Sequence, residues 1–253
     1  MPWTSDGNTT IVSAQPEGWH ISNVCVNKSI AVGSAVEGSN NTRQAVHLTN
    51  QSNKIPAYLT LGTPWATAQV RFLWYEVKDN STDGGTWGGI NFTYHPDAIA
   101  YEYKRDNSKG DENATVIAYL WKGTWTQKDV PGNPTWNFIK YVNPTYVDMN
   151  DRERNVLGMQ MQGSLGGEVT HTNDAKLLAS LQKYITNSTK GEWVSDTIPF
   201  DYKDMTSGVE KVNVIFSATD YFGGRNNIVD GNSLTVDNVR FIYYHALDTL
   251  ATT

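Results

Sequence analysis

Short segments in which apolar and polar residues alternate constrain the fold of this chain more than any other feature. They occur at 45–49, 98–104, 192–200, 212–217 and 233–244, whereas residues 114–121 are more continuously apolar, as expected for a central strand. A period of two residues is typical of a β-strand with one buried face. Turn-forming pairs such as Gly88–Gly89 separate these segments. Many short strands joined by such turns predict an all-β sandwich or barrel, and we expect one domain over residues 1–253.

One segment departs from this alternation. The apolar residues of 175–185, AKLLASLQKYI, recur at helical spacing, and Asn173 and Asp174 before them suit a helix cap. We therefore expect one short surface helix. It falls within 121–191, a stretch with few alternating segments, which we interpret as an elaborated insertion. Insertions of that length commonly carry function.

Charge and cysteine content exclude several classes of protein. Twenty basic and 26 acidic residues give a net charge of −6, which argues against binding to nucleic acid or to an anionic membrane. A single cysteine, Cys25, excludes an internal disulfide and a thiolate metal cluster. No apolar run approaches the roughly 18 residues that span a bilayer.

The first residues of the chain do not have the basic start and apolar stretch of a signal peptide. The protein is therefore either cytoplasmic or exported with a leader that is absent from this sequence. We expect the second, with the protein in the periplasm or at the outer-membrane surface.

Two separated motifs resemble a known family. Residues 91–99, NFTYHPDAI, and 101–104, YEYK, match a strand pair of the form F-x-Y-x-P-x-x-L/I-x-x-x-Y-K-Y. Residues 212–218, VNVIFSA, and 231–239, GNSLTVDNV, match an ending of the form I-x-I-x-F-S-S … G-S-x-L-x-V-D-D-V. In these motifs the chain resembles the putative carbohydrate metabolism domain (PCMD) family of anaerobic Gram-negative gut bacteria.

The resemblance implies a jelly-roll β-sandwich similar to carbohydrate-binding modules, and an exported protein. It implies an oligosaccharide or polysaccharide ligand and other glycan-utilisation proteins as partners, but no particular reaction. It also implies a structural calcium ion at Asp237, with Asp230 and Asp6 as further oxygen ligands. In the alternative interpretation Asp237 accepts hydrogen bonds from backbone amides at a strand bend. We expect no other cofactor.

Aromatic residues are the strongest sign of function, because the C–H faces of sugar rings stack on aromatic rings while amides bond the hydroxyls. The chain has nine Trp and 13 Tyr. The expected ligand-binding residues all belong to the insertion, namely Trp121, Trp125, Trp136, Asn137, Tyr141 and Tyr146. Alternatively, these aromatic side chains form the insertion's own small core.

Three functions remain open from the sequence. The leading hypothesis is non-catalytic carbohydrate binding. The second is a glycoside hydrolase or polysaccharide lyase, in which Asp151 and Glu153 would supply the two carboxyl groups that a glycosidase holds roughly 5–10 Å apart. Alternating charges around that pair are also typical of a solvated, self-paired loop. The third is a surface adhesin or protein-interaction module.

Overall fold

The computed structural model describes most of the chain as β-structure. The described residues are 3–5, 14–22, 31–40, 43–52, 54–71, 76–77, 83–123, 125–127, 137–141, 171–173, 176–223 and 227–244. Over these ranges the protein contains twenty strands and no α-helix. In the same ranges no helix is long and apolar enough to cross a membrane. The all-β sandwich expected from the alternating segments is confirmed.

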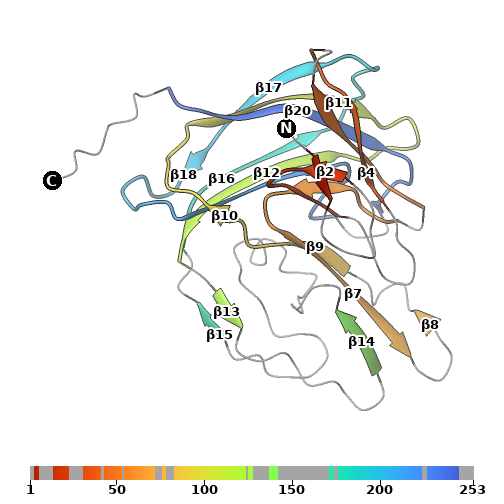
Figure 1. The fold of residues 1–253 in the computed structure, drawn as a ribbon, viewed down its shortest axis with the longest axis horizontal. Helices are drawn as coiled ribbons and strands as arrows, with labels where there is room; N and C mark the ends of the chain where they lie inside the picture. Colours follow the sequence, from red (N-terminus) through yellow and green to blue (C-terminus); the bar gives the residue numbers. More distant parts are fainter. Residues whose placement is uncertain are drawn as a thin grey trace.

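Two large antiparallel sheets face each other (Figure 1). The first sheet has the order β18 (Asp201–Tyr202), β16 (Lys176–Ile185), β12 (Ala114–Lys122), β19 (Lys211–Ser217), β6 (Tyr58–Thr60) and β3 (His20–Ile21), and β10 (Ile90–Asn91) also pairs with β19. The second has the order β17 (Val194–Pro199), β11 (Ala98–Asp106), β20 (Ser233–Ile242), β5 (Gln44–Thr49) and β4 (Gly33–Glu37). Successive strands often change sheet, as from β11 to β12 and from β19 to β20.

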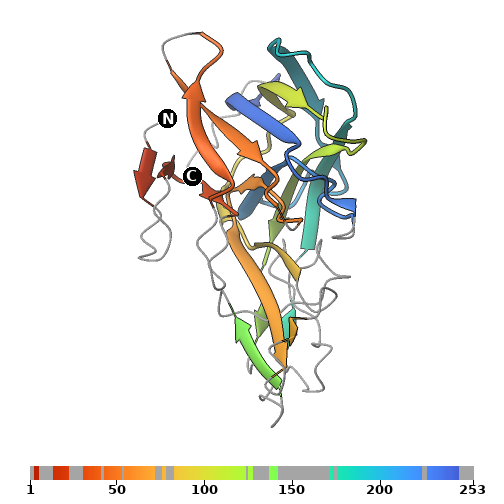
Figure 2. The ribbon, with the colours of Figure 1, turned by 90° about the vertical axis from the view of Figure 1, so that its right-hand side faces the viewer.

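Smaller sheets accompany the sandwich. Strand β7 (Thr63–Arg71) pairs with β14 (Asn137–Tyr141), β8 (Glu76–Val77) and β9 (Asp83–Trp87). Two-stranded sheets join β1 (Trp3–Ser5) to β2 (Ala14–Pro16), and β13 (Trp125–Gln127) to β15 (His171–Asn173). Strands β7, β8 and β13 to β15 lie below the two large sheets in Figure 1, and Figure 2 shows β7 running away from them.

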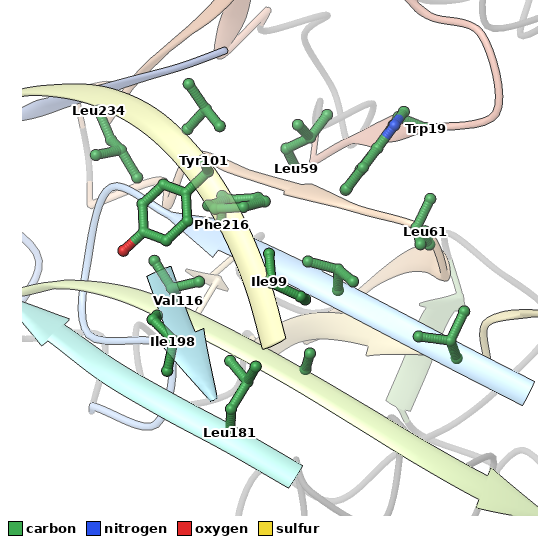
Figure 3. Close-up of a cluster of buried hydrophobic side chains, with 14 of the residues drawn as sticks. Trp19, Leu59, Leu61, Ile99, Tyr101, Val116, Leu181, Ile198, Phe216 and Leu234 are labelled. Carbon is green, nitrogen blue, oxygen red and sulfur yellow. The ribbon is translucent and has the colours of Figure 1, made fainter. Parts of the chain in front are cut away.

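The core fills the space between the two large sheets (Figure 3). Val116 and Phe216 enter it from the first sheet, and Ile99, Tyr101 and Leu234 from the second. These five side chains are almost completely buried. Fully burying one such apolar side chain contributes about 1.5–3 kcal/mol, so the alternating segments stabilise the fold directly.

The expected helix at 175–185 is wrong, because residues Lys176–Ile185 form strand β16. Its whole length pairs with β12, from Ile185 opposite Ala114 to Lys176 opposite Lys122. The register shifts between Leu120 and Trp121, where Leu178 is the additional residue of a bulge. The last part of the expected insertion is thus a strand of the first sheet.

The bulge also explains why the segment resembled a helix. Leu178, Leu181 and Ile185 are buried against the central core, whereas Leu177 packs against a second cluster on the opposite face of the sheet. A strand with apolar residues on both faces and one additional residue has apolar positions three and four residues apart. That spacing coincides with the helical period.

Candidate functional site

Three tyrosines gather at one end of the sandwich. Tyr94 belongs to the connection between β10 and β11, and Tyr243 and Tyr244 follow the last residue of β20. This end is drawn on the left in Figure 1. Tyr94 is 52% exposed and Tyr244 is 69% exposed, whereas Tyr243 is partly buried. We call these three residues the tyrosine platform.

Ring contacts support the platform from the core outwards. Phe200, which is buried, lies 6.4 Å from Phe241, and Phe241 lies 4.8 Å from Phe92, between ring centroids. Phe92 in turn meets Tyr94 edge to face at 5.7 Å. Tyr94 then meets Tyr243 at 6.3 Å, again edge to face. A continuous series of packed rings therefore holds Tyr94 and Tyr243 in place.

Backbone and carboxylate hydrogen bonds fix the same region. The amide of Asp97 donates to the carbonyl of Ile242, and the amide of Phe200 donates to the carbonyl of Asp97. The Asp97 carboxylate accepts a hydrogen bond of 2.6 Å from the amide of Tyr244. Asp97 therefore ties the connection before β11 to the end of β20 and brings a carboxylate next to the platform.

His95 and a fourth tyrosine, Tyr202, also lie in this region. The His95 ring stacks on Tyr202 with centroids 6.0 Å apart, and His95 Nε2 lies 3.0 Å from the carbonyl oxygen of Ser207. Because a carbonyl only accepts, this contact requires Nε2 to carry the proton. The Tyr202 hydroxyl donates to the carbonyl of Pro96 at 2.8 Å, and burial raises the pKa of Tyr202.

Tyr243 keeps its phenol proton at neutral pH. Burial raises the pKa of Tyr243, and the neighbouring Tyr94 adds to this effect. Neutral phenol rings present flat apolar faces and a hydroxyl that both donates and accepts hydrogen bonds. Together with the Asp97 carboxylate, such an arrangement suits a ligand that has apolar C–H faces and hydroxyl groups.

Trp121 is buried, contrary to the expectation that it binds the ligand. It is 1% exposed and packs with Ile117, Tyr119 and Ile215 on the face of the first sheet that lies away from the central core. The backbone of Gly89 lies against its ring, since a Cβ at Gly89 would be 2.8 Å from a Trp121 ring carbon. The indole therefore has no exposed face for stacking.

The other predicted ligand-binding residues are only partly within the described residues. Trp125 begins β13, and Asn137 and Tyr141 lie at the two ends of β14, which belongs to another sheet. The structure describes the backbone but not the side chains at these three positions. Trp136 and Tyr146 lie outside the described residues, as do the predicted catalytic pair, Asp151 and Glu153.

The aspartates expected at a calcium site act as hydrogen-bond acceptors. Asp237 accepts from the Ser39 amide at 2.9 Å, the Ser39 hydroxyl at 3.0 Å and the Asn238 amide at 2.7 Å. Asp230 accepts from the Lys54 amide at 3.0 Å, and Asp6 lies outside the described residues. Where the chain is described, no three His, Cys, Asp or Glu side chains are grouped to hold a metal ion. The contacts of Asp237 match the alternative interpretation, an aspartate that bonds amides at a strand bend.

Glu102 and Asp237 are the carboxylates that stand directly opposite each other on neighbouring strands of the second sheet. The Asn238 side-chain amide and the Ser195 hydroxyl both donate to Glu102. Hydrogen bonds from Ser39 and Asn238 lower the pKa of Glu102. A general acid of a glycosidase instead needs a raised pKa, so Glu102 is suited to accepting hydrogen bonds and not to protonating a leaving group.

The sequence analysis did not identify the platform, although a signal for it was present. The alternation of β20 continues past its end as Phe241-x-Tyr243, and Phe92-x-Tyr94 repeats the same spacing before β11. Aromatic residues at a period of two beyond the end of a strand indicate a surface that continues the core face.

Comparison with known proteins shows that solved structures share the fold of this chain. No protein-family model matches the chain, and no curated protein matches it. A crystal structure from Bacteroides thetaiotaomicron, described as a putative glycoside hydrolase, aligns with a TM-score of 0.53 and 14% identity, over 96% of this chain and 70% of that one. A second, from Bacteroides vulgatus and described in the same way, aligns with a TM-score of 0.51 and 12% identity, over 95% of each chain. The protein therefore has the β-sandwich fold of these two structures.

Proposed function

We propose that the protein binds a carbohydrate without cleaving it, and that the tyrosine platform is its binding surface. The observation that carries this proposal is the exposure of Tyr94 above a packed series of aromatic rings, together with the exposure of Tyr244 just after β20. A sugar ring would stack on these faces, while Asp97 and the tyrosine hydroxyls bond its hydroxyl groups. Such a surface is open and wet, which favours weak binding.

Two further points support the same role. The two aligned crystal structures carry descriptions as putative glycoside hydrolases, which favours a carbohydrate-related role for this fold. The motifs at 91–104 and 212–239 resemble the PCMD family, and the first of them contains Tyr94. We infer that the protein belongs to this family and acts outside the cytoplasm with other glycan-utilisation proteins.

Calorimetry against glycans first selected on a glycan array tests the proposal. We expect Tyr94→Ala and Tyr244→Ala each to weaken binding about tenfold, the loss of a stacking contact of roughly 1.4 kcal/mol. Tyr184→Ala is the matched control, because Tyr184 is 42% exposed on β16 and belongs to no part of the platform. Trp125→Ala and Trp136→Ala test the site expected in the insertion.

The outcomes separate the two sites. Loss of binding in the Tyr94 and Tyr244 variants but not in the Tyr184 variant supports the platform. Loss only in the Trp125 and Trp136 variants would move the site to the insertion. Absence of binding to every glycan on the array would reject carbohydrate binding, and an adhesin function would then be preferred.

A glycoside hydrolase is the second candidate, favoured by the descriptions of the two aligned structures. Its acid and base would then be Asp151 and Glu153, because the opposed pair Glu102 and Asp237 is held as hydrogen-bond acceptors. This candidate predicts release of reducing sugar, abolished by Asp151→Asn or Glu153→Gln. Unchanged release in both variants, or no release from the glycans that bind, would reject it.

A further inference from the structure

A pocket of about 170 Å³ opens between the two large sheets, beside the connection of β4 to β5. Trp19 and Leu59 line it from the side of the first sheet, and Val46 and Val236 from the second. Figure 3 shows Trp19 and Leu59 at one edge of the core. The inner wall of the pocket is therefore apolar and partly aromatic.

The pairing of β20 explains why the sandwich opens at this point. Its residues pair with β5 only from Ser233 to Val236, whereas on the other side they pair with β11 as far as Ile242. A bulge lies between Asp237 and Arg240, and Asn238 takes a left-handed backbone conformation with φ of 53°. The second sheet consequently lacks the pairing of β20 with β5 next to Asp237, and the pocket lies there.

Two arginines lie at the rim. Arg43, just before β5, is exposed, and its guanidinium has no hydrogen-bond or ion-pair partner in the part of the chain that the structure describes. Arg240 is also exposed and donates one hydrogen bond, of 3.3 Å, to the carbonyl of Asn238. A guanidinium has five N–H donors, so most donors of this pair remain available to a ligand.

The remaining charge at the rim does not neutralise these arginines by direct pairing. Asp237 lines the pocket, but its two oxygens accept from the Ser39 amide and hydroxyl and from the Asn238 amide. Neither Arg43 nor Arg240 forms an ion pair with it in the described structure. The chain as a whole is acidic, with a net charge of −6, whereas this apolar pocket is bordered by two arginines.

This combination defines the chemistry of the ligand. A guanidinium binds carboxylate and sulfate groups with two parallel hydrogen bonds, and it discriminates against neutral groups. The volume is below the roughly 300–1,000 Å³ of pockets that hold a whole drug-sized ligand, so this pocket suits a charged substituent with part of its ring. Trp19 is 8% exposed, so such a ring would meet only the part of its side chain that lines the pocket.

The pocket and the platform lie in series along one strand. Val239, which lines the pocket, precedes Tyr243 by four residues, so the two side chains lie on the same face and are about 13 Å apart in an extended strand. One oligosaccharide can therefore reach both. We propose that the pocket binds the carboxylate or sulfate of an acidic sugar whose neighbouring unit stacks on the platform, so that the ligand is an acidic glycan. This inference rests on the proposed function.

The test compares three oligosaccharides of equal length by calorimetry at low ionic strength: an oligogalacturonate, a sulfated carrageenan fragment and a neutral galacto-oligosaccharide. The first two distinguish carboxylate from sulfate. We expect one of them to bind at least about tenfold more tightly than the neutral sugar, as charge-assisted hydrogen bonds allow. Arg43→Gln and Arg240→Gln should each weaken binding of the acidic oligosaccharide about tenfold and leave binding of the neutral oligosaccharide unchanged.

Lys109→Gln is the control, since it removes an exposed cation from the connection between β11 and β12, next to Gly231 and away from the pocket. It should change neither affinity, and thermal melting checks that each variant is folded. Equal binding of acidic and neutral sugars by the wild type overturns the acidic-ligand inference and leaves carbohydrate binding intact. An acidic preference retained in the Arg43→Gln/Arg240→Gln double variant also overturns it. If the wild type binds none of the three, the inference fails, whereas the proposed function is decided separately by the array.

Discussion

Tyr94 and Tyr243 meet edge to face, with ring centroids 6.3 Å apart and ring planes at 75°. One precedes β11 and the other follows β20, so the contact joins two strands of the second sheet that pair along most of their length. The pair is therefore positioned by the sheet and not by a local turn. A ligand that stacks on the platform meets a surface that is already formed.

A double-mutant cycle measures this contact. Tyr94→Ala, Tyr243→Ala and the double variant should show a coupling free energy of about 0.5–1 kcal/mol in urea unfolding, the range of an aromatic pair with one exposed member. The same cycle for Tyr94 and Tyr184 is the control and should be additive, because these rings lie on different sheets. A Tyr94–Tyr243 coupling no larger than the control would mean that the rings are not in contact in solution.

Asp237 should stabilise the connection of β4 to β5 through Ser39. Asp237→Ala removes an acceptor that is only 9% exposed and leaves the Ser39 and Asn238 amides without their partner. We expect a loss of about 2–3 kcal/mol in the free energy of unfolding, with faster hydrogen exchange at the Ser39 amide. Asp111→Ala, at an exposed position, should change stability by less than about 0.5 kcal/mol. Equal effects of the two variants would contradict this role for Asp237.

The sequence predicted the sandwich because short apolar or alternating segments are separated by turn residues, and these segments form long antiparallel strands. Strand β16 was mistaken for a helix because sequence periodicity does not distinguish a bulged strand with two apolar faces from a helical stripe. Its partner β12 lies more than fifty residues earlier along the chain. Only that long-range pairing decides the conformation of the segment.

The functional surface was predicted less well for a related reason. Trp121 and Tyr94 are both aromatic residues next to a strand end, and nothing local distinguishes their exposure. Trp121 is covered because the Gly89 backbone lies on it, whereas Tyr94 lies at the end of the sandwich with only other rings beside it. Exposure depends on which segment covers a face, and this is a property of the assembled sheets.

Glu112 should make the stability of the protein depend on pH. Burial raises the pKa of Glu112, although Asn50, Asn232 and Thr219 donate hydrogen bonds to its carboxylate. The folded chain thus binds this proton more tightly than the unfolded chain. The contribution of protonated Glu112 to the free energy of unfolding is fully present below the pKa of the unfolded chain, about 4.5. It is lost as the pH rises through the raised pKa of the folded chain.

Urea unfolding of the wild type and Glu112→Gln across pH 4 to 8, about the range in which a raised carboxyl pKa acts, isolates this effect. As the pH rises through the lower part of that range, the free energy of unfolding of the wild type should fall relative to that of the variant. Glu192→Gln, which replaces an exposed carboxyl group, is the control. A Glu112 difference that is flat with pH would show that the folded carboxyl group is not desolvated.

Gly89 should be required for the segment that covers Trp121. A Cβ at this position would lie 2.2 Å from the carbonyl oxygen of Val212 and 2.8 Å from the Trp121 ring, and the first contact is with the backbone of β19. Gly89→Ala must therefore displace β10 from β19, at a cost of about 1–3 kcal/mol. Gly208→Ala is the matched control, since a Cβ there would have no atom within 4 Å and would cost nothing in packing. Thermal unfolding should show a lower Tm for Gly89→Ala and an equal or higher Tm for Gly208→Ala, and equal melting of the two variants would contradict the close approach of β10 to β19.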